Sequence, residues 1–152
     1  MAMGFALQAG DSKSWQDLGL DIEAGLAARV TRLGGSLLGQ GRILLPAAGP
    51  DGFEIQLQDG DQGVTGNFGG LVQDFSSLEE ALNWAERTFT EDYRLRIDYI
   101  GKKPWRWALE KRTQLGGVVE LFASGHFVLL RSLRKPSVAY RCNFGGIGDV
   151  WH

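Results

Sequence analysis

The residues Tyr93 to Arg112, YRLRIDYIGKKPWRWALEKR, alternate apolar with charged side chains on both sides of a Gly-Lys-Lys-Pro sequence. An alternation with a period of two residues is typical of a β-strand that buries one face. Glycine and proline between two such runs indicate a turn. The stretch therefore predicts a β-hairpin whose apolar side chains face a core and whose charged side chains face outward.

A register for this hairpin follows from the residues that each pairing brings together. With a five-residue loop, complementary residues fall opposite one another, as stable cross-strand pairs require. The predicted pairs are Tyr99–Trp105, Ile97–Trp107 and Leu95–Leu109 on the inner face, and Asp98–Arg106 and Arg94–Glu110 on the outer face. The cations that this register leaves unpaired are Arg96, Lys102, Lys103, Lys111 and Arg112.

Two segments have apolar residues at intervals of three and four, which is typical of a helix with one buried stripe. The first spans about 15–33 and ends at a pair of glycines, 34–35. The second spans about 77–90, and Ser76 with Glu79, or Ser77 with Glu80, forms a capping box at its start. We therefore expect an N-terminal helix and a central helix.

Further strands are predicted on both sides of the central hairpin. Residues 53–58 alternate between apolar and polar, and a turn at 59–63 leads into a second strand that starts near Val64. Three more strands are predicted at 118–123, 126–133 and 137–144. This order of elements predicts an α+β fold with a mainly antiparallel sheet of about five to six strands.

The length of the chain, 152 residues, is that of one domain. We expect a single domain over 1–152, with an N-terminal helical arm at 1–35 and an α+β core at 53–152. The connection at 36–52 contains glycine and proline around a short apolar run, Ile43 to Leu45. That run fits either a linker or a brief edge strand.

The composition is that of an ordinary globular protein, with 43% hydrophobic and 22% charged residues. Its single cysteine, Cys142, cannot form an intramolecular disulfide. The first residues lack the features of a signal peptide, and no run approaches about 18 apolar residues. These observations predict a cytoplasmic protein without a membrane segment.

Charge is distributed unevenly along the chain. Residues 1–92 carry 5 Lys and Arg against 14 Asp and Glu, whereas residues 93–152 carry 11 against 4. Such a split indicates either a basic face for an acidic partner, or two halves that neutralise one another within the fold or across a dimer.

No motif in the sequence fixes a reaction. There is neither a GxxxxGK[ST] loop nor a GxGxxG between a strand and a helix, and the histidines and cysteine lack the spacing of a metal site. We therefore predict no cofactor, no metal and no catalytic residue. If the last two strands pair about Arg134 and Lys135, Cys142 lies opposite Phe127 and His126 points to the other face, so Cys142 and His126 need a shift of register to touch.

The sequence Asn-Phe-Gly-Gly occurs twice, at 67–70 and at 143–146, each time after a predicted strand. A duplication and a shared type of turn both explain the match. In a chain with 22 glycines the shared turn is the simpler explanation.

Three functions fit these patterns, and they are given in decreasing order of support from the sequence. The first is a small non-catalytic binding module that contacts another protein, or its own copy, through an acidic N-terminal and a basic C-terminal face. The second is single-stranded nucleic-acid binding by the basic C-terminal sheet, although the aromatic residues there face inward. The third is an enzyme with a carboxylate or Cys142/His126 site. The candidate contact residues are Arg96, Lys102, Lys103, Lys111, Arg112, Arg134 and Lys135.

Overall fold

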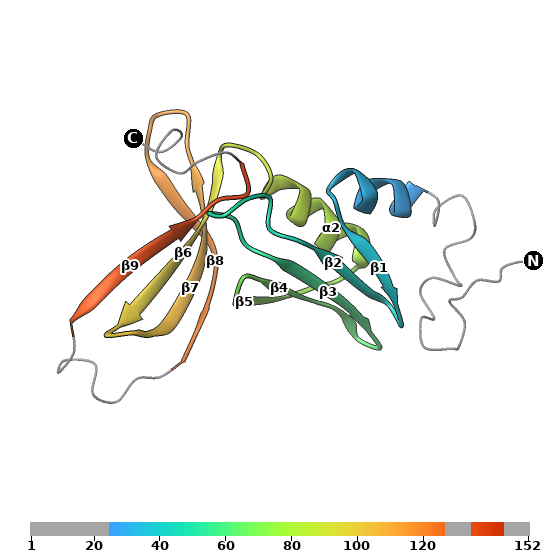
Figure 1. Ribbon diagram of the computed structural model, residues 1–152, viewed down its shortest axis with the longest axis horizontal. Helices are drawn as coiled ribbons and strands as arrows, with labels where there is room; N and C mark the ends of the chain where they lie inside the picture. The colour runs from blue at the N-terminus through green and yellow to red at the C-terminus, as the bar shows by residue number, and fades with distance from the viewer. Residues whose placement is uncertain (1–24, 127–134, 145–152) are drawn as a thin grey trace, which may run out of the picture.

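The computed structural model describes residues 25–126 and 135–144, and it has an α+β fold built from two antiparallel sheets and two helices (Figure 1). The N-terminal helix is helical over 25–32 of the described residues. The other elements are β1 (Ser36–Gly39), β2 (Arg42–Leu45), β3 (Ile55–Gly60), β4 (Gly63–Phe68), β5 (Leu71–Phe75), α2 (Leu78–Arg87), β6 (Tyr93–Ile100), β7 (Lys103–Arg112), β8 (Val118–Gly125) and β9 (Pro136–Arg141).

The first sheet is a meander in which β1 to β5 pair in chain order, each antiparallel to the next. Alternate residues of its strands point to one face, and α2 and the N-terminal helix cover that face. The core there includes Ile55, Leu57 and Leu71 from the strands and Leu82 from α2, all almost fully buried. Outward residues such as Gln56 are exposed, so the other face of this sheet is in contact with solvent.

The second sheet has the order β8-β7-β6-β9 and is antiparallel throughout. The hairpin of β6 and β7 forms its centre. β8 pairs with β7 on one side, and β9 pairs with β6 on the other, with Ile100 opposite Pro136 and Leu95 opposite Arg141. Figure 1 shows the two sheets at opposite ends of the long axis of the molecule.

The register predicted for the β6–β7 hairpin is confirmed at four of its five pairs, Ile97–Trp107, Leu95–Leu109, Asp98–Arg106 and Arg94–Glu110. The fifth prediction, Tyr99–Trp105, is wrong, because Tyr99 lies opposite Pro104 and Trp105 is the extra residue of a β-bulge. Gly101, at a φ of 63°, closes the strands with a two-residue turn instead of a five-residue loop. The extra residue of the bulge compensates for the shorter turn, so the predicted pairing holds from Asp98–Arg106 onward.

An aromatic junction, made of Phe75, Trp84, Tyr93 and Phe122, joins the two sheets. Trp84 of α2 meets Phe122 of β8 edge to face at 4.7 Å and Tyr93 of β6 at 6.4 Å, while Phe75 of β5 meets Phe122 at 6.0 Å. All three pairs have the edge-to-face geometry that aromatic rings favour. A hydrogen bond from the Val72 amide of β5 to the Ser124 hydroxyl of β8, 3.1 Å long, supports the same junction.

The end of the second sheet is fixed to the segment between β2 and β3 by Asn143, which is buried. Its side-chain oxygen accepts hydrogen bonds from the amides of Phe53 (2.9 Å) and Ala48 (3.3 Å), and its side-chain nitrogen donates to the Phe53 carbonyl (3.1 Å). Asn67, at the same place in the other Asn-Phe-Gly-Gly, is exposed and accepts only from the Gly70 amide within its own turn. The two asparagines therefore have different roles, although residues 145–146 lie outside the described part.

The predicted fold class is confirmed, with differences in detail. The strands form two sheets of five and four strands, whereas one sheet of five to six was predicted. Residues 36–39 and 42–45 of the predicted connection form β1 and β2, so the run Ile43 to Leu45 is a strand and not a linker, but it lies between β1 and β3 and not at an edge of the sheet. Residues 15–24 and nearly all of the predicted strand 126–133 lie outside the described residues, and the division into a single domain of three parts remains a prediction.

The central helix is confirmed as α2, with Ser77 as its N-cap. The Ser77 hydroxyl accepts a hydrogen bond from the Glu80 amide (3.1 Å), and the Glu80 carboxylate accepts one from the Ser76 amide (2.8 Å). The capping box therefore satisfies one first-turn donor of the helix, the Glu80 amide, and the amide of Ser76 just before the N-cap. No helix in the described part of the chain is long and apolar enough to cross a membrane.

Gly70 gives a test of how closely the sheets approach. It has a φ of 115°, and an added Cβ would lie 2.7 Å from an indole carbon of Trp107. Gly116, at a φ of 87°, has open space around it and serves as the control. We expect Gly116→Ala to lower the free energy of unfolding by about 1 kcal/mol through backbone strain, and Gly70→Ala by a further ~2 kcal/mol through the clash. Urea denaturation measures both, and equal losses would contradict the close packing.

The N-terminal helix is attached to α2 by an ion pair that gives a pH test. The guanidinium of Arg29 donates to both carboxylate oxygens of Glu86, at 2.9 and 2.8 Å, and these hydrogen bonds hold the pKa of Glu86 below its ordinary value of 4.5. Because the folded state binds this proton less readily than the unfolded state, the stabilisation is present above pH 4.5 and is lost as the pH falls through the lowered pKa.

We therefore expect Glu86→Gln to lower the free energy of unfolding by about 1 kcal/mol at neutral pH and by almost nothing well below pH 4.5. Urea denaturation at both pH values measures the difference. Glu91→Gln, at an exposed glutamate with no ion pair to the described residues, is the control and should leave stability almost unchanged at both. A loss that persists undiminished in acid would show that packing, and not charge, explains the effect.

Candidate functional site

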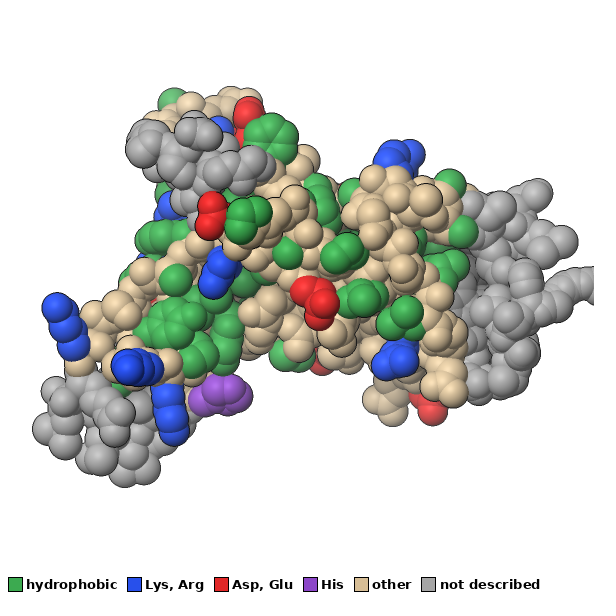
Figure 2. Space-filling view, in the orientation of Figure 1, with side chains coloured by type: hydrophobic (Ala, Val, Ile, Leu, Met, Phe, Trp, Pro, Cys, Tyr) green, Lys and Arg blue, Asp and Glu red, His purple; other side chains and the backbone are tan. Residues whose placement is uncertain are grey.

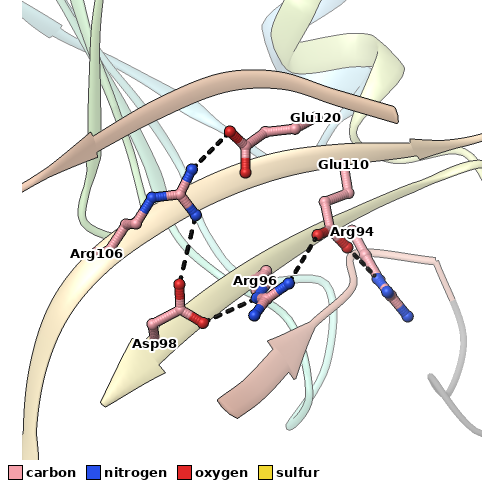
Figure 3. A network of polar contacts seen from close by, with 6 residues as sticks. All are labelled: Arg94, Arg96, Asp98, Arg106, Glu110 and Glu120. Atoms are coloured by element: carbon pink, nitrogen blue, oxygen red, sulfur yellow. Dashed lines mark hydrogen bonds and ion pairs between the residues drawn. The ribbon is translucent and has the colours of Figure 1, made fainter. Parts of the chain in front are cut away.

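The outer face of the second sheet carries a continuous row of ion pairs, which we call the ionic row (Figure 3). Its six members come from β6, β7 and β8 and alternate in charge. In order, the contacts are Arg94–Glu110 at 2.8 Å, Glu110–Arg96 at 3.7 Å, Arg96–Asp98 at 2.8 Å, Asp98–Arg106 at 3.4 Å and Arg106–Glu120 at 2.5 Å.

The two carboxylates in the middle of the row are well covered. The side chain of Glu110 is 6% exposed and that of Asp98 is 12% exposed. A carboxylate in such surroundings is costly unless cations and hydrogen bonds compensate it, and the arginines above supply both. The hydrogen bond to Asp98 raises the pKa of Arg96, and the hydrogen bond to Glu120 raises the pKa of Arg106, so both guanidiniums are held in their charged form.

This arrangement corrects two of the residues predicted to be unpaired. Arg96 pairs with Asp98, two residues along its own strand, and with Glu110, diagonally across the hairpin. Arg112 pairs with Asp92 at 3.6 Å. The prediction considered only residues directly opposite one another, whereas long side chains on one face of a sheet also reach diagonal neighbours. With three arginines and three carboxylates, the row is neutral and offers no excess charge to a ligand.

Three of the predicted cations do come together, at the end of the hairpin far from the first sheet. Lys102 lies in the turn and Lys103 begins β7, and the Gly101 amide donates to the Lys135 carbonyl at 3.0 Å, which places Lys135 beside them. All three lysines are exposed and form no ion pair with the described residues. We call Lys102, Lys103 and Lys135 the basic tip, and Figure 2 shows basic side chains gathered at this end.

The remaining candidates lie elsewhere. Lys111 is at the other end of β7, roughly 27 Å from Lys103 at about 3.4 Å per residue, and its ammonium lies 5.6 Å from the ring centre of Tyr93. Arg112 is beside it. Arg134 lies outside the described residues. The seven candidates therefore do not form one surface.

Cys142 and His126 lie far apart. They follow β9 and β8, which are at opposite edges of a four-stranded sheet, so about three strand spacings, roughly 14 Å, separate the two edges. They are also at opposite ends: the His126 amide donates to the Trp105 carbonyl near the basic tip, and the Cys142 thiol contacts the Tyr93 carbonyl at the base of the hairpin. Burial raises the pKa of the Cys142 thiol, which disfavours the nucleophilic thiolate. The pairing of Cys142 with Phe127 concerns a residue outside the described part.

The aromatic residues of this sheet are largely occupied within the fold. Tyr93 is buried in the aromatic junction, and Trp107 packs against the core and meets the His126 ring edge to face at 5.5 Å. On the outer face, the Arg94 guanidinium covers the Tyr140 ring at 3.8 Å. Among the described residues, no three His, Cys, Asp or Glu side chains are grouped in a way that could hold a metal ion.

Sequence reasoning missed Glu120 as a member of the ionic row and Asp92 as the partner of Arg112. Glu120 joins through the pairing of β8 with β7, where a bulge between Leu109 and Glu110 sets Glu120 opposite Glu110. A strand from Val118 to Ala123 was predicted, but nothing local specified its register against β7.

Comparisons with protein-family models, with curated proteins and with solved structures found no match for this chain.

The ionic row predicts unequal effects for two similar substitutions. Glu110→Gln removes a covered carboxylate that two arginines share, and we expect it to lower the free energy of unfolding by about 2–3 kcal/mol, because the covered guanidinium of Arg94 then loses its ion pair with Glu110. Glu120→Gln, at the end of the row where the side chain is 42% exposed, should cost under about 1 kcal/mol. Chemical denaturation at neutral pH compares them, and equal losses would contradict a role for burial in the row.

Proposed function

We propose that this chain is a small non-catalytic binding module that associates with a charged protein partner, or with a second copy of itself, through an acidic first half and a basic second half. The observation that supports it most is that most ion pairs of the described residues lie within one half of the chain and do not join the acidic half to the basic half. A cytoplasmic location belongs to the same proposal and rests on the single cysteine.

The uneven charge of the sequence corresponds to the two sheets. Residues 25–92, which contain the first sheet and the two helices, carry 4 Lys and Arg against 10 Asp and Glu. The described residues of the second sheet and its turns, 93–126 and 135–144, carry 9 against 3. The excess of acidic residues therefore belongs to the part that contains the first sheet, and the excess of basic residues belongs to the second sheet.

The ion pairs support this separation. Among those that join described residues, Arg112–Asp92 crosses between the halves, whereas Arg29–Glu86 and Arg32–Glu86 lie within the acidic half and the ionic row lies within the basic half. The excess charge of each half is therefore available to another molecule. Charged regions of this kind accelerate association and select partners of opposite sign.

The basic tip is the most favourable contact region on the second sheet, because its three lysines are exposed and the ionic row beside it is neutral. In the first sheet, the end of β3 carries Asp59, the β3–β4 turn carries Asp61, and the nearby start of α2 carries Glu79. A second copy has both regions, so a head-to-tail contact between tip and turn is the form of self-association that the charges favour.

Single-stranded nucleic-acid binding is a second candidate, which the exposed lysines of the tip favour. It has less support, because such binders stack bases on exposed aromatic rings, whereas Tyr93 and Trp107 pack inward and Arg94 covers Tyr140. The third candidate, an enzyme using Cys142 and His126, has no support from their positions at opposite edges of the sheet.

A charge-reversal experiment tests the proposal. We expect the full chain to self-associate, or to bind an oligoglutamate peptide, at low salt, with affinity that falls as salt screens the charges. Lys102→Glu should weaken this association about five- to ten-fold. Arg42→Glu, an equal change of charge at an exposed residue of the acidic half, is the control and should not weaken it.

Sedimentation velocity measures self-association, and fluorescence anisotropy measures binding of the labelled peptide. A chain that stays monomeric and ignores the peptide at low salt would overturn the proposal. Tighter binding of labelled oligothymidine than of oligoglutamate, lost in Lys102→Glu, would instead favour the nucleic-acid candidate.

A further inference from the structure

A pocket of about 850 Å³ lies in the acidic half, between the N-terminal helix, the β3–β4 end of the first sheet and the start of α2. Its apolar wall comes from one residue of each element: Leu26, Val64 and Leu78. These residues also belong to the hydrophobic core, so the pocket opens onto the interior of the fold. A volume of this size is typical of sites that hold a small organic molecule.

The charged groups of the pocket are one cation and two carboxylates, but the cation is already occupied. Arg29 donates to Glu86 through two nitrogens and to Asn83 at 2.5 Å, all on α2. Asp59 and Glu79 have no comparable partner, since neither forms an ion pair with the described residues. The side chains that remain available to a ligand are therefore acidic.

Asp59 is the carboxylate of the pocket with the more unusual surroundings. It lies opposite Val64 in the β3–β4 ladder, on the face of the sheet that elsewhere carries buried apolar residues, and it is half-buried. Burial raises its pKa, the Asp61 charge adds to that effect, and only a hydrogen bond from the Gly60 backbone opposes it. A carboxylate on an apolar face without a cation is energetically unfavourable, and a cationic ligand would relieve that cost.

The start of α2 does not offer a competing site for an anion. The Glu80 amide already donates to the Ser77 hydroxyl, and the first turn of the helix carries two carboxylates, Glu79 and Glu80, which disfavour an anion there. Both Glu79 and Asp59 would also repel a negative charge. The available carboxylates of the pocket therefore favour a cationic ligand over an anionic one.

We propose that this pocket binds a small amphiphilic cation, an alkyl- or arylammonium compound whose apolar body contacts Leu26, Val64 and Leu78 and whose ammonium group lies against Asp59. The apolar wall provides affinity and the carboxylate fixes the orientation and the sign of the charge. The inference concerns the acidic half alone and does not depend on the proposed association with a partner.

The test uses the full chain and three probes with the same eight-carbon body, octylammonium, octanol and octanoate, in isothermal titration calorimetry at neutral pH. We expect octylammonium to bind one molecule per chain with a dissociation constant below about 1 mM, and octanoate to bind at least about ten-fold more weakly. Shifts in the backbone amide NMR signals of Gly60, Gly63 and Ser77 would place the ligand in the pocket.

Two matched variants complete the test. Asp59→Asn removes the charge while keeping the shape, and it should weaken octylammonium binding about ten-fold and leave octanol unaffected. Asp74→Asn, on the outer face of the same sheet where its carboxylate accepts from the Thr65 hydroxyl, should change neither. Thermal unfolding confirms that both variants fold. No saturable binding of octylammonium, equal binding of octanoate, or unchanged affinity in Asp59→Asn would each overturn the proposal.

Discussion

The aromatic junction of Phe75, Trp84, Tyr93 and Phe122 is the contact on which the rest of the structure depends. Each sheet has one apolar face, and two sheets at opposite ends of a molecule share a core only where their strands meet. Trp84 makes that meeting possible, because α2 lies on the first sheet and its indole reaches both Phe122 and Tyr93 of the second. The close approach of the two sheets also requires glycine at position 70, since a side chain there would collide with Trp107.

The local parts of this fold were predictable from the sequence. Alternation fixed four of the five pairs in the β6–β7 hairpin, and the serine and glutamate at 77 and 80 correctly located the start of α2. The bulge at Trp105 was not predictable, because a five-residue loop and a two-residue turn with a bulge satisfy the same pattern of apolar and charged residues. Only the backbone geometry of Gly101 distinguishes them.

The long-range parts were not predictable, and these include most of the candidate site. Nothing near Pro136 to Arg141 specifies that this strand pairs with β6, so the separation of Cys142 from His126 and the closeness of Lys135 to the basic tip followed only from the structure. Arg96 was predicted to be unpaired because its partners lie diagonally and not opposite. The uneven distribution of charge was visible in the sequence. Which ion pairs form within each half depends on which strands share a sheet, and the sequence did not reveal that.

The attachment of Asn143 to Phe53 has a consequence for how the chain reaches its final form during synthesis. The two residues are 90 positions apart, and β9 pairs with a strand some 40 residues before it, whereas the first sheet and the central hairpin are built from neighbours in sequence. Contacts between near neighbours form at little cost in chain entropy, and distant ones wait for the intervening chain. The first sheet can therefore assemble while the ribosome is still making the second. Asn143, which follows β9, then attaches to Phe53 in the segment before β3.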